Sequence, residues 1–535
     1  MHLESTLLIL FGVAAAVAIV SHRLRLPYTI ALVLTGLALG AIHVLHAPHL
    51  SKELLFLIVL PGLIFEAAYH MQFREFWEAK VSIFSLAVPG LLVAVGATGF
   101  MVWLGVNQLH FGELTLMEAM VFGALIAATD PISVLAIFKT LGVDRKLYVL
   151  VEGESLFNDG TAVVVFTILL AMATGHDTTL GGAIFEFVKV VGMAAAVGAV
   201  MGSLGSLVTR TLEEPVIEIT LTALTAYGSF IIAEHFGYSG VIACVVAGML
   251  TGNWGARIGM SATTRLAVES FWEYAAFVLN SLVFLLVGLE VKVADLVRHL
   301  VPILVAWVAV VIGRAAVVFL KQLIVGRLAP SARMPSAWAA ALTWGGLRGG
   351  LSMVLALALP RTFVHRELIL TLTFGVVLLS LLVQGLTMKP LLARLGLAGR
   401  ATDREAYERR LARLRAAGRA VEELETMHRA RTVPTAVFHD LHERYTDRVK
   451  QMETEITELH LEREDIRAEE SLAVQRHLLA VEKESLRETY NYGLIAEPVL
   501  RGLTGELDQR LLSLEIAATH PGDADTAGKD EETAS

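Results

Sequence analysis

The chain has 535 residues, of which 55% are hydrophobic and only 18% charged, and its mean hydropathy is +0.63. A typical soluble domain is about one quarter charged, so this composition excludes a single soluble enzyme. The charges are also unevenly placed, because residues 401–535 carry 29 of the 52 acidic and 19 of the 43 basic side chains. The first 400 residues are therefore nearly neutral, which indicates a polytopic membrane protein with an acidic, soluble C-terminal part.

A single cysteine, Cys244, excludes a disulfide framework and a cysteine-based metal cluster. No segment is basic enough to predict binding to nucleic acid. The first apolar stretch, residues 7–20, lacks a positively charged segment before it and a convincing cleavage site after it. We therefore interpret it as a membrane span and not as a removable signal.

A transmembrane helix needs about 20 mainly apolar residues. Apolar runs predict thirteen such helices, near residues 5–22, 28–45, 53–70, 81–106, 116–140, 147–173, 182–210, 216–236, 239–253, 266–290, 300–326, 337–359 and 367–393. Loops on one side of these spans hold thirteen Lys or Arg and the opposite loops hold five. The more basic loops are expected in the cytoplasm, which predicts a plasma (inner) membrane protein with an outside N-terminus and a cytoplasmic tail.

The fifth span is interrupted near its middle by the segment Thr129-Asp130-Pro131. Pro131 removes a helical hydrogen bond and pushes the preceding residue out of the α region. An Asp or Thr followed by proline is also typical of a helix start. We therefore expect two half-helices, with Asp130 facing the positive end of the second. The alternative is a simple proline kink that Asp130 caps.

The twelfth span is weakened at its middle by four glycines around Arg348, in residues 345–350. Interrupted helices at corresponding places of two halves predict an inverted-repeat transporter with its site at the midplane. Here spans 1–6 would correspond to spans 8–13, so that the fifth span pairs with the twelfth. Close packing of glycines between helices is the alternative, but it does not explain the arginine.

The sixth span carries a cluster of polar residues. Ser155 and Asp159 are four residues apart and share one helical stripe, while Glu154 and Asn158 form a second stripe. The Ser155 hydroxyl, the Asp159 carboxylate and the carbonyls freed near Thr129 are oxygen ligands, which suit hard cations. Asn158 could instead only form a hydrogen bond between helices, and both interpretations stay open.

Two further charges lie inside predicted spans, where each is a candidate for function. Glu66, in the third span, could add a carboxylate to the site or extend to the inner membrane surface. Arg314 lies in the middle of the eleventh span and requires a partner, for which Glu154 is favoured. We expect this pair to be structural, because removing one member leaves a buried charge at a cost of about 3–5 kcal/mol.

Taken in chain order, these motifs resemble those of the NhaP-type sodium/proton antiporters, within the monovalent cation/proton antiporter family. The resemblance rests on Phe65-Glu66, Thr129-Asp130-Pro131, Gly153-Glu154-Ser155, Asn158-Asp159, Gly313-Arg314 and Gly346-Leu347-Arg348-Gly349. It implies a homodimer in the lipid membrane, with a scaffold at about 1–75 and 182–292 and a moving core at about 80–175 and 300–395.

The same resemblance assigns roles to residues. Asp159 would be the main ion- and proton-binding carboxylate, with Na⁺ held by Asp159, Ser155, Thr129 and Glu66. Asp130 and the Thr129 carbonyl would lie at the crossing of the broken helices, Glu66 and Ser155 would complete the site, and Asn158 is counted among the ion- and proton-binding residues. Support for the broken helices would come from Pro131, Gly346, Arg348 and Gly349.

The function that follows is exchange of Na⁺ or Li⁺ for H⁺ by alternating access, serving pH and sodium homeostasis. Burial disfavours an uncompensated carboxylate, so a core that crosses only when Asp159 is neutralised couples the two fluxes without a cofactor or ATP. The Asn158-Asp159 pattern implies electroneutral one-for-one exchange. A K⁺/H⁺ antiporter of the same fold is the alternative. A cation channel is less favoured, because it would need a continuous polar pore. An intramembrane hydrolase would need a base near Ser155.

The C-terminal part is predicted to be helical over 401–430 and 436–515, with a break at Pro434. Its apolar spacing is not a clean heptad, so a long parallel coiled coil is not secured. We expect a transmembrane antiporter domain over 1–398, a helical cytosolic domain over 399–520 and a disordered acidic tail over 521–535. No motif in this part indicates its partner.

Overall fold

The computed structural model describes residues 3–24, 27–42, 55–111, 113–175, 179–210, 214–256, 260, 262–291, 293–328, 333–398, 400–462 and 464–519. Within these ranges the regular elements are all helical, without a strand, so the all-α prediction is confirmed. The chain divides into two units, Met1–Ala401 and Thr402–Ser535, and each is described by itself. The predicted disordered segment 521–535 lies outside the described residues.

Eight helices of the described chain are long and apolar enough to cross a membrane. They are Phe73–Gln108, Leu116–Leu141, Arg145–Ala173, Gly181–Thr209, Pro215–His235, Thr264–Leu289, Leu300–Val325 and Arg366–Arg394. Four shorter apolar helices accompany them, at Leu8–Ser21, Tyr28–Ala41, Phe56–His70 and Gly240–Gly255. Helices satisfy their own backbone hydrogen bonds, which is what a segment within lipid requires.

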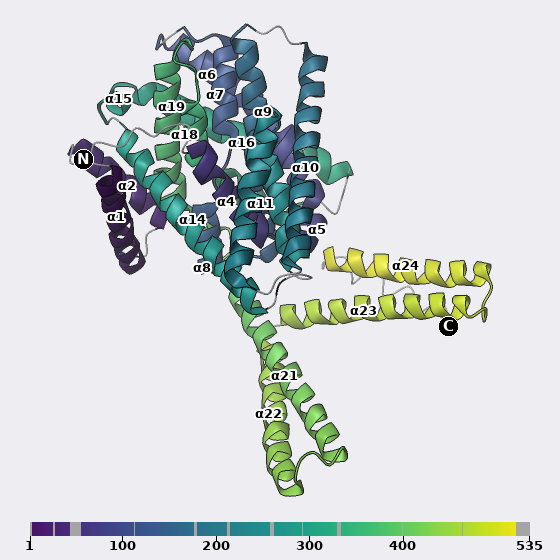
Figure 1. Ribbon diagram of the computed structural model, residues 1–535. Coiled ribbons are helices and arrows are strands. Elements are labelled where there is room, and N and C mark those ends of the chain that lie inside the picture. The colour runs from purple at the N-terminus through teal and green to yellow at the C-terminus, as the bar shows by residue number, and fades with distance from the viewer. Residues whose placement is uncertain are drawn as a thin grey trace. The chain divides into compact units, whose positions relative to one another are not determined.

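The first half of the bundle contains α1 (Leu3–Leu24), α2 (Tyr28–Ala41), α4 (Leu60–His70), α5 (Phe73–Ser85), α6 (Leu91–Gln108), α7 (Leu116–Ala127), α8 (Ile132–Leu141) and α9 (Arg145–Ala173). The second half contains α10 (Leu180–Thr209), α11 (Pro215–His235), α12 (Gly240–Leu250), α14 (Ala262–Glu290), α15 (Val293–Arg298), α16 (Leu300–Leu328), α17 (Ser336–Trp344), α18 (Gly350–Leu357), α19 (Arg366–Leu379) and α20 (Leu386–Arg394). Among the described residues, π-helical turns lie directly before α4, at η1 (Leu55–Val59), between α5 and α6, at η2 (Leu86–Gly90), directly after α12, at η3 (Thr251–Gly255), and between α19 and α20, at η5 (Ser380–Gly385). Figure 1 shows these helices in chain colours.

The C-terminal part consists of α21 (Arg400–Arg429), α22 (Thr435–Glu462), α23 (Glu464–Asn491) and α24 (Glu497–Thr519). Helix α22 begins directly after Pro434, whose fixed φ suits a helix start. The rings of His428 and Phe438 stack with their centroids 4.0 Å apart and so join α21 to α22. Helices α23 and α24 pack against each other.

Helices α2 and α14 pack so closely that their backbones touch. A Cβ atom on Gly36 would lie 2.2 Å from the carbonyl oxygen of Leu285, and one on Gly288 would lie 2.3 Å from that of Val33. Only glycine fits at such a contact. Because each glycine faces the other helix, α2 and α14 form one tightly joined pair beside the site described below.

Two apolar segments are interrupted in the middle. Helix α7 ends at Ala127 and α8 begins at Ile132, with Pro131 directly before it. In the same way α17 ends at Trp344 and α18 begins at Gly350. These are the two interruptions expected from the sequence. Helix α9 passes them as one unbroken helix of 29 residues.

Candidate functional site

The two interrupted segments cross each other. The Asp130 N–H donates a hydrogen bond of 2.8 Å to the carbonyl oxygen of Leu347. At the same crossing, a Cβ atom on Gly349 would lie 2.3 Å from both Cβ and Oδ2 of Asp130. A glycine is therefore required where the second segment passes the aspartate.

Arg348 caps the end of α7. Its guanidinium donates hydrogen bonds to the carbonyl oxygens of Ala127, at 2.6 Å, and Ala128, at 3.2 Å. The last carbonyls of a helix have no partner within it and carry its negative dipole end. The arginine, which is only 2% exposed, therefore satisfies both the hydrogen bonds and the partial charge. Its backbone N–H is held in turn by the Ser380 hydroxyl, at 3.1 Å.

Helix α9 contributes the polar side chains that bind the first interruption. The Ser155 hydroxyl donates to the carbonyl oxygen of Thr129. The Asn158 amide donates to the carbonyl oxygen of Ala127 at 3.1 Å and to the Thr129 hydroxyl oxygen at 3.2 Å. Three side-chain hydrogen bonds thus hold the broken backbone of one helix against an unbroken one.

Two carboxylates face this arrangement. One Asp159 oxygen, Oδ1, is buried and has no hydrogen-bond partner in the described structure. Asp130 Oδ1 accepts a hydrogen bond of 3.0 Å from the Ile132 N–H, at the start of α8. The two side chains interact electrostatically, and among the described residues neither forms an ion pair with a cationic side chain. A cation or proton between them would relieve their repulsion.

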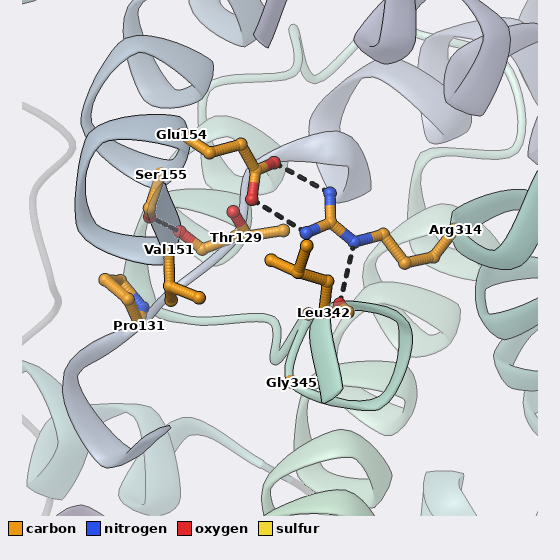
Figure 2. A pocket seen from close by; sticks show the side chains of 9 residues that line it. Thr129, Pro131, Val151, Glu154, Ser155, Arg314, Leu342 and Gly345 are labelled. Carbon is orange, nitrogen blue, oxygen red and sulfur yellow. Dashed lines mark hydrogen bonds and ion pairs between the residues drawn. The ribbon is translucent and has the colours of Figure 1, made fainter. Parts of the chain in front are cut away.

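Glu154 and Arg314 form a bidentate ion pair next to this site (Figure 2). Both guanidinium–carboxylate distances are 2.7 Å, and the two residues are 2% and 6% exposed. Arg314 Nε also donates to the carbonyl oxygen of Leu342 at 3.2 Å. Parallel hydrogen bonds of this kind are strong and fix the orientation of both groups. The structure thus contains the pair that the sequence favoured.

A small cavity lies between the ion pair and the first interruption. Figure 2 shows Ser155 and Thr129 on one side of it and Arg314 on the other. It is lined by Thr129, Pro131, Val151, Glu154, Ser155, Arg314, Leu342, Gly345 and Gly346. A Cβ atom on Gly346 would lie 3.0 Å from Arg314 Nε, so this glycine leaves room for the guanidinium.

Glu66 lies apart from these contacts. Its carboxylate is 3.3 Å from Nδ1 of His70, one turn further along α4, and its electrostatic neighbours include Glu152 and Tyr148 of α9. In the described structure no hydrogen bond joins it to Ser155 or Asp159. The sequence did not indicate His70, because an i, i+4 contact of glutamate and histidine is ordinary on a helix surface.

The charges at the crossing do not cancel. Asp130, Glu154 and Asp159 are acidic, whereas Arg314 and Arg348 are basic, so their ordinary charges leave an excess of one negative charge. Arg314 is bound by Glu154 and Arg348 by helix carbonyls. The uncompensated charge therefore falls on the two aspartates, and one monovalent cation or one proton would neutralise it.

Residues 8–394 match the model of the family described as sodium/hydrogen exchanger, transmembrane. The chain belongs to the sodium/hydrogen exchanger family. An exchanger moves ions and makes or breaks no lasting covalent bond, so this chain is a transporter and not an enzyme. With its eight long apolar helices, it is a multi-pass membrane protein, as the composition predicted.

Individual members of the exchanger family are similar over most of the chain. It is 37% identical over 519 residues to the Na(+)/H(+) antiporter NhaG of Bacillus atrophaeus, which covers 94% of this chain and 95% of that one. It is 41% identical over 426 residues to the low-affinity Na(+)/H(+) antiporter NhaS1 of Synechocystis, with 78% and 80% covered. The predicted antiporter family is confirmed.

A solved structure of the same fold is that of the sodium proton antiporter MjNhaP1 from Methanocaldococcus jannaschii. The TM-score is 0.62 at 19% sequence identity, and the match covers 74% of this chain and 99% of that one. At this identity the likeness concerns the fold of the exchanger family and not the individual side chains.

Proposed function

We propose that this chain exchanges Na⁺ or Li⁺ for H⁺ across the membrane, one for one, by alternating access. The observation that carries the proposal is the unpartnered Asp159 carboxylate beside Asp130, at the crossing of two interrupted helices. Relatives named Na⁺/H⁺ antiporters, at 37% and 41% identity, support the choice of ions.

Competition for one site explains the coupling. A buried carboxylate is stable when it holds either a proton or a cation, and it cannot hold both usefully. If the core crosses only in the neutralised state, each crossing carries one Na⁺ or one H⁺ and the exchange uses no cofactor. The net charge of minus one at the crossing supports one ion per crossing, and hence electroneutral exchange.

The ligands we propose for Na⁺ are all oxygens, as a hard cation prefers. Asp159 and the Thr129 carbonyl would bind the ion, with the Ser155 hydroxyl turning its lone pairs toward it. Asp130 would set the local charge and Asn158 would hold the break. Glu66 would bind the ion only if its side chain moves away from His70. We therefore propose that Glu66 is a ligand in only one stage of the transport cycle.

The arrangement in the membrane is part of the proposal. Thirteen spans with the N-terminus outside the plasma (inner) membrane and the acidic C-terminal domain in the cytoplasm agree with the distribution of basic loops. In α10 only 11% of the most apolar window is buried within the chain, against 39% or more in the other seven long helices. Such an exposed face suits lipid or a second copy, and we propose a homodimer.

Purified protein in liposomes with an internal pH dye tests the exchange. Addition of Na⁺ or Li⁺ on one side should move protons at once, whereas K⁺ should have little effect. Rates that are equal with and without valinomycin, at equal K⁺ concentrations on both sides to clamp the voltage at zero, would support electroneutrality. A response to K⁺ alone would favour K⁺/H⁺ exchange, and steady unitary currents in a planar bilayer would contradict any exchanger.

A further inference from the structure

The first turn of α2 contacts the first interrupted segment and the π-helical turn η5 through adjacent residues. Tyr28, Thr29 and Ile30 follow Pro27 directly, at the start of the helix. Each of the three side chains makes a different contact, and none of them was singled out by the sequence. In the proposed exchange cycle, α2 belongs to the scaffold, whereas the segments it contacts belong to the moving core.

Tyr28 anchors the turn on the scaffold side. Its ring stacks on Phe277 of α14 with centroids 5.3 Å apart and an interplanar angle of 11°. Its hydroxyl lies 2.7 Å from the Ser281 hydroxyl and 3.3 Å from the carbonyl oxygen of Ala14 in α1. Together with the glycine contact between α2 and α14, these bonds fix the position of the turn relative to two neighbouring helices.

Thr29 reaches across to the core side. Its hydroxyl forms a hydrogen bond with the hydroxyl of Ser133, in the first turn of α8. Both residues are 4% exposed, so neither hydroxyl can easily exchange its partner for water. Ser133 is three residues from Asp130, which caps the same turn through the Ile132 N–H. A displacement of Ser133 would therefore move the backbone that carries Asp130.

Ile30 packs against η5, at a point that Leu347 of the second interruption also approaches. A Cβ atom on Gly385 of η5 would lie 2.9 Å from Cδ1 of Ile30 and 3.9 Å from Cδ1 of Leu347. Leu347 is the residue whose carbonyl oxygen accepts the Asp130 N–H. One turn of α2 thus contacts the polar start of α8 and the apolar surroundings of the crossing. These two contacts lie in the first and in the second part of the core, which are far apart in the sequence.

We propose that Thr29 and Ser133 are positioning residues of the exchange cycle. Their hydrogen bond stabilises the conformation described here and breaks each time the core moves relative to α2. This inference rests on the proposed function, since it needs a moving core. It adds a polar contact between scaffold and core that lies outside the ion site and determines how readily that site is repositioned.

Point variants test the hydrogen bond in the full chain. Thr29→Val and Ser133→Ala should each change the apparent KM for Na⁺ in the same direction by about threefold to tenfold, as expected for loss of one buried hydrogen bond. The double variant should equal either single one, because both remove the same bond. Thr29→Ser should restore the KM to within about twofold.

Thr35 provides the matched control in the same helix. Its hydroxyl donates to the Ala31 carbonyl oxygen of its own helix at 2.8 Å, so Thr35→Val should leave the KM unchanged. Additive effects of Thr29→Val and Ser133→Ala, or an equal effect of Thr35→Val, would overturn the proposal.

A cross-link tests the movement itself. Thr29→Cys with Ser133→Cys, in a Cys244→Ser background, places two thiols where two hydroxyls are hydrogen-bonded, within reach of a disulfide. Oxidation should form the cross-link, seen by mass spectrometry, and lower Na⁺-driven proton flux at least about tenfold; reduction should restore it. Single-cysteine variants should not respond.

The outcomes separate this inference from the proposed function. The unaltered chain must show Na⁺-driven proton flux, and its failure to do so would contradict the proposed exchange; the Cys244→Ser protein must then match it, because Cys244 is buried. If the Cys244→Ser protein exchanges, two results overturn the inference. One is a cross-linked protein that transports as fast as the same protein with its two thiols free. The other is a folded protein in which the two thiols do not form a cross-link.

Discussion

Asp159 and Asn158 are neighbours with different partners. The Asn158 amide nitrogen donates two hydrogen bonds to the first interruption, whereas one oxygen of Asp159 is buried without a partner. Among the described residues, the Asn158 amide oxygen is buried without a hydrogen-bond partner as well. Asn158 therefore holds the broken backbone through its nitrogen and also presents an unpartnered oxygen, so the structure fits both interpretations of this residue, as a helix-to-helix hydrogen bond and as part of the ion site.

Replacing the carboxylate tests the role of Asp159. Asp159→Asn removes the charge that attracts either ion but keeps the size of the side chain, so exchange should be abolished while the protein still inserts and purifies as a folded protein. The measurement is Na⁺-driven proton flux in liposomes. Asp295→Asn, which neutralises an exposed carboxylate on α15, should transport normally. Flux persisting in Asp159→Asn would exclude it as the ion-binding group.

The Glu154–Arg314 pair should matter for stability more than for ion affinity. Glu154→Gln leaves a buried guanidinium without its counter-charge and should lower the free energy of unfolding by about 3–5 kcal/mol. Adding Arg314→Met should recover part of this loss, because the unpaired charge is then gone. Thermal unfolding in detergent measures both. A Glu154→Gln protein as stable as the parent would contradict the structural role.

Among the elements, the two interrupted segments depend on each other at one narrow contact. Arg348, from the second segment, satisfies the last carbonyls of α7, and the Leu347 carbonyl oxygen accepts the Asp130 N–H of the first. Neither interruption is therefore a free end. Each supplies the hydrogen-bond partners that the other lost when its helix was broken.

Gly349→Ala should disturb this crossing. The new Cβ atom would fall 2.3 Å from Asp130 Cβ and Oδ2, so the aspartate must move, and we expect Na⁺-driven flux to fall at least about tenfold. Gly96→Ala on α6 is the matched control, because its Cβ atom would meet no atom within 4 Å. Equal flux in both variants would show that the crossing tolerates displacement of Asp130.

The helix breaks and the buried charge pair could be predicted, whereas contacts between neutral side chains could not. Pro131 predicts the break because a proline acts on residues next to it in the chain. Arg314 predicts an acidic partner because a lone buried charge is costly. The contact of Thr29 with Ser133 depends on how helices rotate and pack, and the i, i+4 contact of Glu66 with His70 is one of many that a helix surface allows. A hydroxyl group or a histidine in a helix can form its hydrogen bonds with many different partners. The residue type alone therefore does not predict which partner it has.

For the whole molecule, competition between ions predicts how the rate depends on pH. Protons occupy the carboxylate as pH falls, so the apparent KM for Na⁺ should rise, by at most about tenfold for each pH unit. At a fixed, low Na⁺ concentration the exchange rate should therefore increase with pH until the site is deprotonated. Stopped-flow pH-dye measurements at several Na⁺ concentrations test this. An apparent KM that is constant over several pH units would contradict a shared site.

The contacts that complete the site join segments far apart in the chain, and this has a consequence for biosynthesis. Glu154 and Arg314 are 160 residues apart, and Ala127 and Arg348 are 221 residues apart. The ribosome therefore delivers α7, α8 and α9 to the membrane long before either arginine exists. During that interval Glu154 lacks the guanidinium that pairs with it, and the carbonyl oxygens of Ala127 and Ala128 lack the Arg348 side chain that caps them. The site is thus assembled in the last stage of insertion, and a chain that stalls before α17 holds its carboxylates without the cap that joins the two broken helices.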